Sequence, residues 1–473
     1  MTIKVSIRDY VVFLCYLFYF VSLFIWSNTL TTDFINSHPY EDLLFPWIVI
    51  SITIALTSFF IIKKVSIFDF GFWFYILSNC FMFGYVFFEV FNMNTTLLWQ
   101  PGTYFTRINL FKSCYYALVC LTFFSFIYIL TYDSKKIHSK TSYNYSFKID
   151  NSIKKTVGIF LYILGFFSTL YLSSKVITAT QSIGSYTGYS SISLNGLIAT
   201  FAQLTVPGLF LVLNAEEKIK RKGKFLFYFT LLFNVIYMIL SGSRKTQIFT
   251  ILVIVLFYQW KKRMSGERIK TNLKVIFTGL VFLDLIYIIR EYRMTLYSVP
   301  KAFIESLIKM TFFKNLLAET FAETGLTLYS VTSIVTFVPS VFKYELGKTF
   351  LKSLPSVLPV GGLLRETFDS ATSTYVINKY IGIPTGSSLL GDFYWNFGFW
   401  GGVIATCIFA MISSKFLAPL LYKRTEIYFT LFFVLISSVR LGIFEITRPL
   451  ILIGFLPFLI VNYVLNSRRK IYE

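Results

Sequence analysis

Arginine and lysine side chains mark the ends of several strongly apolar segments. The stretch YMILSGSRKTQIFTIL, residues 237–252, places Arg244 and Lys245 in a tight connection between two such segments. Arg290 and Arg293 end another segment, and their spacing of three residues puts them on one helix face. Three further arginines occupy a long connection or other segment ends: Arg365, Arg440 and Arg448.

These cations predict an anion-binding site. Two like charges about 8 Å apart repel by roughly 2 kcal/mol at an effective dielectric near 20. A cluster of them is therefore favourable only with an anion, and the arginine fork donates two parallel hydrogen bonds to phosphate oxygens. Two simpler roles for these side chains stay open. Each cation could snorkel to lipid headgroups, or pair locally with Glu291, Glu366 or Glu445.

A second group of residues opens a later apolar segment, GSSLLGDFYWNFGFWGG, residues 386–402. Helical periodicity puts Asp392, Trp395, Asn396 and Phe399 on one face. A carboxylate within reach of hydrocarbon is costly and is a functional candidate. The aromatic, carboxylate and amide groups could together grip a sugar ring, with Tyr394 beside them. The alternative is an interfacial aromatic belt in which Asp392 is the charge at a helix N-terminus.

In the same stretch, glycines recur on one side of the expected helix. Gly391, Gly398 and Gly402 form a small-residue face that another helix can approach closely.

The elements that position these residues are membrane helices. The chain has 473 residues, of which 55% are hydrophobic and 20% aromatic, and its mean hydropathy is +0.66. These values exceed those of a soluble domain. We predict an all-α bundle in one integral membrane domain, residues 1–473, and the first span is retained because it lacks a cleavage site. Twelve segments have the length of a span: 9–28, 43–62, 69–91, 113–131, 156–173, 194–214, 225–240, 246–260, 271–289, 388–413, 425–440 and 447–466.

Loop charge predicts the orientation. Basic runs such as EEKIKRKGK and KKRMSGERIK occur in alternate connections, which by the positive-inside rule are cytoplasmic. Both termini are then inside, and the arginines described above lie outside. The net charge of +21 is explained mostly by this topology. It gives no reason to invoke nucleic acid, because the basic runs lack an associated soluble domain.

One connection is much longer than the others. Residues 290–387 form a large outer loop, and a loop of this length in a compact bundle is usually functional. Within it, KAFIESLIKMTFFKNLLAE (301–319) has the apolar periodicity of one amphipathic helix at the interface. The next stretch, residues 325–342, is apolar but short, and we expect a re-entrant or buried helix there.

Other kinds of site are disfavoured. The five cysteines lie in or beside spans without metal-ligand spacing, and His38 and His138 are the only histidines. No glycine-rich phosphate loop stands out. We therefore expect neither a metal nor a cofactor.

These features resemble a known family. SGSRK in a tight outer hairpin, a large outer loop after a helix ending REYR, and GSSLLGDFYWNFGFWGG opening a late span are similar to the Wzy-type polymerases of bacterial O-antigen and capsular polysaccharide repeat units. The resemblance implies a protein of the bacterial cytoplasmic membrane. It would transfer a growing glycan from undecaprenyl pyrophosphate to the non-reducing end of a new lipid-linked repeat unit on the outer face. A protein that regulates chain length is a partner that the resemblance leaves open.

The resemblance also suggests roles for the residues. A lipid pyrophosphate leaving group requires positive charge, and the acceptor hydroxyl requires a base. We assign the pyrophosphate to Arg244, Lys245, Arg290, Arg293, Arg440 and Arg448. The candidate bases are Asp392 first, then Glu291 and Glu445. The sugar-binding candidates are Tyr394, Trp395 and Asn396.

Three rival functions remain. An O-antigen ligase also releases undecaprenyl pyrophosphate, but that family carries an important histidine in its large outer loop, and residues 290–387 contain none. Another type of multi-span lipid-linked-sugar glycosyltransferase would use acidic residues in the first outer loop, where Asp33, Glu41 and Asp42 lie. A lipid-linked oligosaccharide flippase is the non-enzymatic alternative, although flippases usually place polar groups near the membrane midplane.

Overall fold

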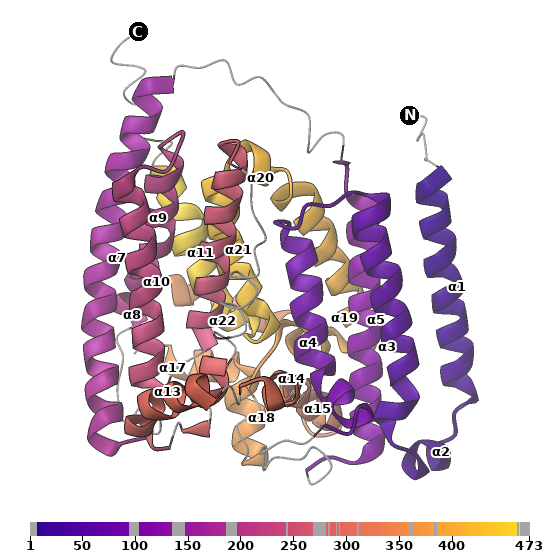
Figure 1. Cartoon of the computed structure of the whole chain (residues 1–473). Coiled ribbons are helices and arrows are strands. Elements are labelled where there is room, and N and C mark those ends of the chain that lie inside the picture. The colour runs from indigo at the N-terminus through magenta and orange to yellow at the C-terminus, as the bar shows by residue number, and fades with distance from the viewer. Residues whose placement is uncertain are drawn as a thin grey trace.

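The computed structural model is a bundle of helices (Figure 1). It describes residues 7–93, 104–134, 147–185, 196–242, 245–267, 281, 284–289, 291–292, 294–309, 312–358, 364–382, 386–460 and 463. Within these ranges there is no β-strand. The all-helical class predicted from the sequence is therefore confirmed.

Nine helical segments in the described ranges are long and apolar enough to cross a membrane. The first five lie in α1 (Ile7–Thr29), α3 with η1 (Tyr40–Ile62), α4 (Phe70–Val90), α5 (Arg107–Thr131) and α7 (Phe147–Ile183). The other four comprise α8 and α9 (Gly196–Gln203 and Thr205–Asn214), α10 (Arg221–Ser241), α19 to α20 (Leu389–Lys423), and α22 with η8 and the residues that follow (Ile443–Ile460).

The predicted count of twelve is not confirmed. Helix α11 (Lys245–Met264) forms where a span was predicted, but Lys261, Lys262 and Arg263 occupy its last turn, and it is not among the nine. The predicted span at 425–440 is a shorter apolar helix, α21 (Thr425–Ile436) with η7 (Ser437–Val439). Most of the predicted span 271–289 lies outside the described residues.

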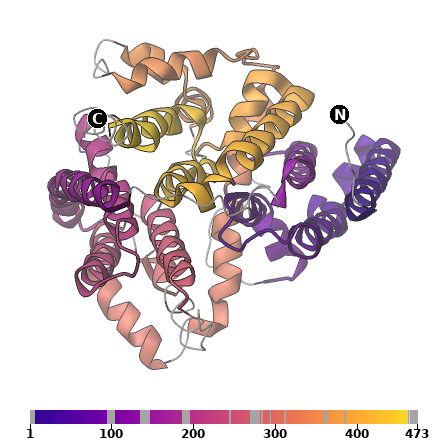
Figure 2. The same cartoon turned by 90° about the horizontal axis from the view of Figure 1, so that it is seen from above.

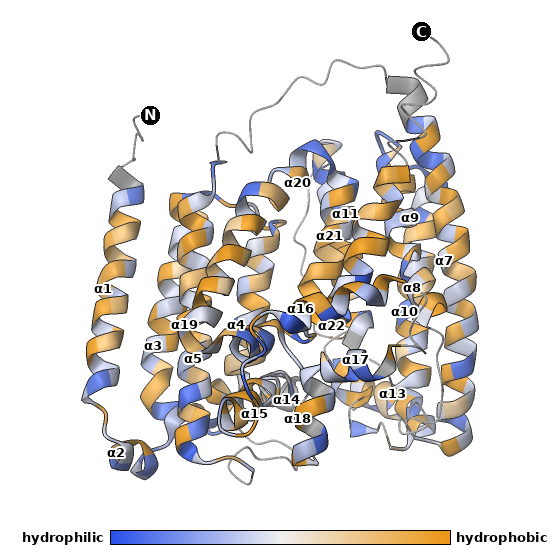
Figure 3. Cartoon of the chain, turned by 180° about the vertical axis from the view of Figure 1, so that it is seen from behind, coloured by the Kyte–Doolittle hydropathy of each residue, from blue (hydrophilic) through white to orange (hydrophobic). Residues whose placement is uncertain are grey.

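Basic residues form ion pairs at the end of the bundle where α1 begins, which is the upper end in Figure 1. There, Lys154 of α7 contacts Glu426 of α21 at 3.3 Å, and Lys155 contacts Glu216 at 3.2 Å. Hydrophobic residues predominate along the helices between this end and the opposite one (Figure 3). We call the end with the Lys154 and Lys155 ion pairs the basic end.

At the same end, Asp69 and Tyr428 join three helices. Asp69 caps α4 and accepts hydrogen bonds from Gly71 N at 2.9 Å and from the hydroxyl of Tyr128 in α5 at 2.5 Å. The hydroxyl of Tyr428 in α21 donates to Phe68 O at 2.9 Å. These contacts hold α21 against α4 and α5.

The described helices of residues 290–387 lie at the end opposite the basic end (Figure 1). In the stretch predicted to be amphipathic, α13 ends at Lys309 and α14 begins at Phe312. Helix α13 (Val299–Lys309) exposes Ile304 and Ile308, while α14 (Phe312–Gly325) packs on α4. The other helices here are α15 (Leu328–Phe337), α16 (Lys348–Ser353), α17 (Arg365–Ser370) and α18 (Ser373–Ile381).

Helix α15 is the apolar stretch expected to be re-entrant or buried. Its ten residues rise only about 15 Å, too little to cross a bilayer. Residues 328–334 are buried, and α15 packs against α5 and α19 (Leu389–Ile412).

Seen along the bundle axis, the N-terminal helices form one side and α7 with α10 the other (Figure 2). The C-terminal helices α19, α21 and α22 (Ile443–Pro449) lie between them. The C-terminal residues therefore contact both halves of the bundle.

Candidate functional site

The candidate site is built around the N-terminus of α22. The first helical N–H groups have no partner inside a helix and need acceptors from elsewhere. Two carboxylates supply them. Asp392 Oδ2, from the first turn of α19, accepts from Ile443 N at 2.6 Å. Glu445 Oε2 reaches back and accepts from Gly442 N at 2.9 Å.

The motif GSSLLGD, residues 386–392, forms the cradle for this helix end. Ser388 caps α19 by accepting from Gly391 N at 3.2 Å. Ser387 accepts from Gly442 N at 3.0 Å and donates to Glu445 Oε2 at 2.7 Å. The motif thus joins the start of α19 to the start of α22.

Asp392 is buried, with 3% of its surface exposed. Its second oxygen, Oδ1, accepts from the hydroxyl of Ser373, the first residue of α18, at 2.9 Å. A Cβ atom added to Gly442 would overlap the carboxylate, so glycine is needed there. Both oxygens of Asp392 are therefore occupied by protein donors, and the side chain joins α18, α19 and α22.

Glu445 lies on the wall of a cavity of about 320 Å³. This volume is within the range of small-ligand sites. The cavity lies between α7, α8, α9, α10, α11, α21 and α22. Its lining includes Tyr237, near the end of α10, and Thr246, near the start of α11. The cavity is therefore in the half of the bundle away from the basic end.

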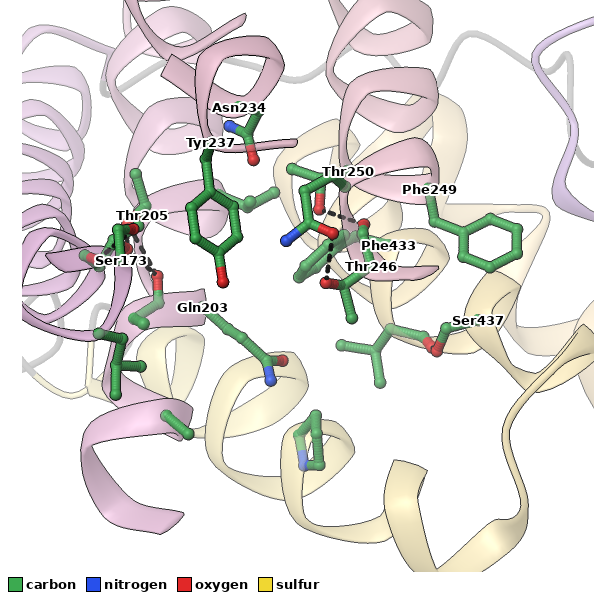
Figure 4. A pocket seen from close by; sticks show the side chains of 18 of the residues that line it. Ser173, Gln203, Thr205, Asn234, Tyr237, Thr246, Phe249, Thr250, Phe433 and Ser437 are labelled. Atoms are coloured by element: carbon green, nitrogen blue, oxygen red, sulfur yellow. Dashed lines mark hydrogen bonds between the residues drawn. The ribbon is translucent and has the colours of Figure 1, made fainter. Parts of the chain in front are cut away.

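The lining mixes aromatic and aliphatic residues with uncharged polar ones (Figure 4). Three amides contribute: Gln203 from α8, Asn234 from α10 and Gln247 from α11. The hydroxyl-bearing members are Thr169, Ser173, Thr205, Thr230, Tyr237, Thr246, Thr250 and Ser437. A water-filled or ligand-filled space explains polar groups at this depth, because lipid would leave them unsatisfied.

Arg448 and Arg440 flank the cavity from different sides. A Cβ atom added to Gly196, the first residue of α8, would lie 2.5 Å from Arg448 Nη1, and α8 also carries the cavity residue Gln203. The Nε atom of Arg448 is buried and has no hydrogen-bond partner in the described part of the chain. Arg440 lies over the ring of Phe81, with Cζ 6.0 Å from its centroid, and Phe81 packs on the cavity residue Phe249.

Other predicted phosphate-binding residues cannot be placed. Arg244, Arg290 and Arg293 lie outside the described residues, as does the side chain of Lys245, although Lys245 begins α11. Thr246 and Gln247, which follow it, line the cavity. Glu291, a candidate base, has an exposed side chain.

The predicted sugar-binding residues have other partners in the structure. Trp395 is 2% exposed and packs with Ile334, Val338 and Ile377. The ring of Tyr394 packs edge-on against Tyr116 at 5.0 Å between centroids. These two aromatic side chains contribute to the packing of α19 against its neighbours.

Asn396 is fully buried. Its Oδ1 accepts from Gly347 N and Thr349 Oγ1, both at 3.0 Å. Its amide therefore fixes the start of α16 to α19.

The predicted single helical face of residues 392–399 is interrupted. Gly398 has φ 70° and ψ −165°, which kinks α19. Phe399 therefore departs from the face of Asp392, and it packs against Tyr115 and Tyr116. The expected close approach at Gly391 and Gly402 is confirmed, since a Cβ atom there would overlap Ile334 or Tyr116.

The cavity amides were not recognised in the sequence. The available signal was the recurrence of Gln and Asn inside otherwise apolar segments, where an unpaired amide is costly. In the described residues, no group of three His, Cys, Asp or Glu side chains is arranged to hold a metal.

These features define a polytopic helical membrane protein with a mixed polar cavity, a carboxylate on its wall and arginines beside it. Comparison with protein families gives a more specific result. The chain belongs to the family described as O-antigen polysaccharide polymerase Wzy, whose model matches residues 11–470. No curated protein and no solved structure matches the chain.

The family match confirms the resemblance inferred from the sequence. The family indicates a glycosyltransferase-type polymerase that acts on lipid-linked oligosaccharide repeat units. It favours this function over the ligase, the other multi-span glycosyltransferase and the flippase.

Proposed function

We propose that this protein polymerises undecaprenyl-pyrophosphate-linked repeat units on the outer face of the bacterial cytoplasmic membrane. The observation that carries the proposal is that Glu445 and Arg448 stand one helical turn apart in α22, with Glu445 on a cavity wall and Arg448 Nε unpartnered within the described residues. A carboxylate and a guanidinium so placed suit a reaction that removes a proton and releases an anion.

The outer-face location rests on charge. The basic end carries the ion pairs of Lys154 and Lys155, and the positive-inside rule makes it cytoplasmic. The cavity and helices α13 to α18 are then on the outer side, and both termini are inside. The lipid-linked substrate would enter from the outer leaflet.

The reaction transfers the growing glycan. The acceptor hydroxyl oxygen of a new repeat unit attacks the anomeric carbon of the sugar joined to undecaprenyl pyrophosphate. A carbon–oxygen bond forms, the bond from that carbon to the pyrophosphate oxygen breaks, and the pyrophosphate leaves with the electron pair. The hydroxyl proton goes to a carboxylate.

Glu445 is our preferred base, because it lines the cavity while both oxygens of Asp392 serve as structural acceptors. This reverses the order expected from the sequence. Asp392 is assigned as a positioning residue that holds α22. Glu291, exposed and absent from the cavity lining, is a less favoured candidate.

Arg448 and Arg440 are proposed to bind the pyrophosphate and stabilise it as it leaves. The guanidinium of Arg448 lies beside Gly196, the first residue of α8. The dipole of α8 also favours an anion at this position. Arg244 and Lys245 precede the cavity residues Thr246 and Gln247 and are proposed to join them, together with Arg290 and Arg293. Preorganised charge of this kind is typically worth about 3 kcal/mol per donor in the transition state.

Replacing Glu445 by Gln tests the proposed base. Glutamine keeps an acceptor for Gly442 N, so α22 remains capped, but it cannot take a proton. Cells lacking the chromosomal copy and carrying Glu445→Gln should make glycans of one or a few repeat units on gels that resolve chain length.

The matched control is Glu345→Gln. Glu345 pairs with Lys352 at 3.5 Å in the large loop and lies outside the cavity lining, so this variant should produce long chains. Wild-type chain length from Glu445→Gln at normal membrane abundance would refute the assignment of Glu445.

A further inference from the structure

The lining of the cavity has a chemistry that neither a pyrophosphate nor a prenyl chain matches. Among its described lining residues, Glu445 is the one acidic side chain, and none is lysine, arginine or histidine. Arg440 and Arg448 lie beside the cavity and are not among its lining residues. A pyrophosphate is therefore not the natural occupant of the interior.

The amide side chains of the lining show whether an apolar prenyl chain or a polar ligand suits the cavity better. A primary amide has two donor hydrogens and two acceptor lone pairs. Asn234 uses one donor on Thr230 O at 2.8 Å. In the described part of the chain, the side chain of Gln203 has no hydrogen-bond partner. A prenyl chain filling the cavity would leave these groups unpaired, which is unfavourable in a site without water.

The hydroxyls are a weaker signal. Thr250 donates to Thr246 O at 2.8 Å within α11, and Ser437, the first residue of η7, donates to Val434 O of α21 at 2.6 Å. Their protons are satisfied locally, but their oxygen lone pairs can still accept. The lining therefore offers donors from amides and acceptors from hydroxyls, which is the complement of a polyhydroxylated ligand.

Aromatic rings provide the second feature of such a site. Tyr237, Phe249 and Phe433 are on the walls (Figure 4). Pyranose rings present C–H faces that pack on aromatic surfaces and hydroxyl edges that require hydrogen bonds. The same cavity offers both kinds of surface.

We propose that this cavity binds one or more uncharged sugar residues of the glycan within the membrane-spanning part of the protein. This deepens the proposed function and rests on it: the sugar so held is the acceptor end of the new repeat unit, whose hydroxyl then faces Glu445. The prenyl chain remains outside, in contact with lipid.

The first test measures binding of a probe without lipid or phosphate. Repeat-unit glycan is released by mild acid from the lipid-linked units that accumulate in cells lacking this protein, and its phosphate is removed. Saturation-transfer NMR with the purified full-length protein in nanodiscs then gives its affinity. Gln203→Leu and Asn234→Leu should each weaken glycan binding by about tenfold or more, because each removes buried hydrogen bonds to the ligand.

Matched controls remove the same residue types elsewhere. Asn79→Leu deletes an equivalent bond, Asn79 Nδ2 to Tyr75 O at 2.8 Å in α4, and Gln181→Leu deletes the bond to Leu240 O at 2.9 Å. Neither residue lines the cavity, and both variants should bind the glycan as the wild type does. Undecaprenyl phosphate should bind equally to all four variants.

A second measurement avoids the leucine variants, in case they fold poorly. Ser437→Cys places a small thiol on the cavity wall, and no native cysteine is among the described lining residues. The phosphate-free glycan should slow reaction of this thiol with a maleimide, and undecaprenyl phosphate should not. Protection by undecaprenyl phosphate alone, or stronger binding of it to the leucine variants, would show that the cavity holds the prenyl chain and overturn the proposal.

The two proposals fail in different ways. A wild-type protein that binds the glycan but never lengthens it would contradict the polymerase function and leave the sugar site intact. A protein that polymerises normally while Gln203→Leu and Asn234→Leu retain wild-type glycan affinity would contradict the sugar site alone.

Discussion

The carboxylate of Asp392 in α19 accepts a 2.6 Å hydrogen bond from the backbone nitrogen of Ile443, the first residue of α22. This contact joins two segments that are 51 residues apart. It fixes the start of the helix that carries Glu445 and Arg448, so Asp392 influences the site without facing the cavity.

The role of Asp392 predicts a difference between two substitutions. Asp392→Asn can still accept from Ile443 N and can donate to Ser373 Oγ, so most polymerase activity should remain. Asp392→Ala leaves a buried N–H without an acceptor and should lower the free energy of unfolding by about 1–3 kcal/mol, with loss of long glycans. Chain-length gels and thermal unfolding measure both effects. Equal inactivity of the two variants, with normal unfolding, would instead identify Asp392 as the base.

Replacing Gly196 by alanine is predicted to reduce activity while leaving the fold nearly as stable. An alanine methyl group there would meet the end of the Arg448 side chain at 2.5 Å, and a flexible side chain can move away. Gly196→Ala should therefore displace the guanidinium and reduce kcat about tenfold or more, with little change in thermal stability. The control is Gly223→Ala in α10, where a methyl group meets Leu213 at 3.0 Å. Full activity of Gly196→Ala would mean that the position of Arg448 is unimportant.

The orientation of the protein in the membrane can be tested with single cysteines in a variant whose five native cysteines are replaced. Glu305→Cys in α13 should react with a membrane-impermeant maleimide on intact spheroplasts, because we assign that end to the outside. Arg263→Cys, at the end of α11, should react only after permeabilisation. The opposite labelling pattern would place the cavity in the cytoplasmic half.

Asp69 predicts a pH dependence of stability. Burial raises the pKa of Asp69 to about 6, and its Oδ2 has no partner within the described residues. Because the folded state binds this proton more tightly than the unfolded state does, the stabilisation is complete below about pH 4 and is lost as the pH rises through 6. The unfolding temperature should fall between about pH 4 and 7, and less so in Asp69→Asn. If the unfolding temperatures of the wild type and Asp69→Asn changed equally with pH, the assignment of this pH dependence to Asp69 would be contradicted.

The sequence predicted some features of the fold and site better than others. Membrane helices were recognisable because an apolar run of this length is rarely anything other than a membrane span. The amphipathic periodicity of 301–319 could not show that α13 and α14 are separate elements, because periodicity does not encode where one helix ends and the next begins. A carboxylate in an apolar segment marked Asp392 as unusual. Only the fold reveals that an oxygen of Asp392 accepts a hydrogen bond from the start of α22, and that Glu445 lines the cavity. Gln203 and Asn234 come from separate helices, so no local pattern could join them.

The central claim is that Glu445 and the neighbouring arginines transfer glycan away from a lipid pyrophosphate, and one assay tests it directly. Purified protein in nanodiscs is given radiolabelled undecaprenyl-pyrophosphate-linked repeat units, and both glycan length and free undecaprenyl pyrophosphate are followed over time. The wild type should release one undecaprenyl pyrophosphate for each unit added, and Arg448→Ala should slow both processes together by about 100-fold or more. Glycan lengthening without release of undecaprenyl pyrophosphate, or unchanged rates in Arg448→Ala and Glu445→Gln, would contradict the account.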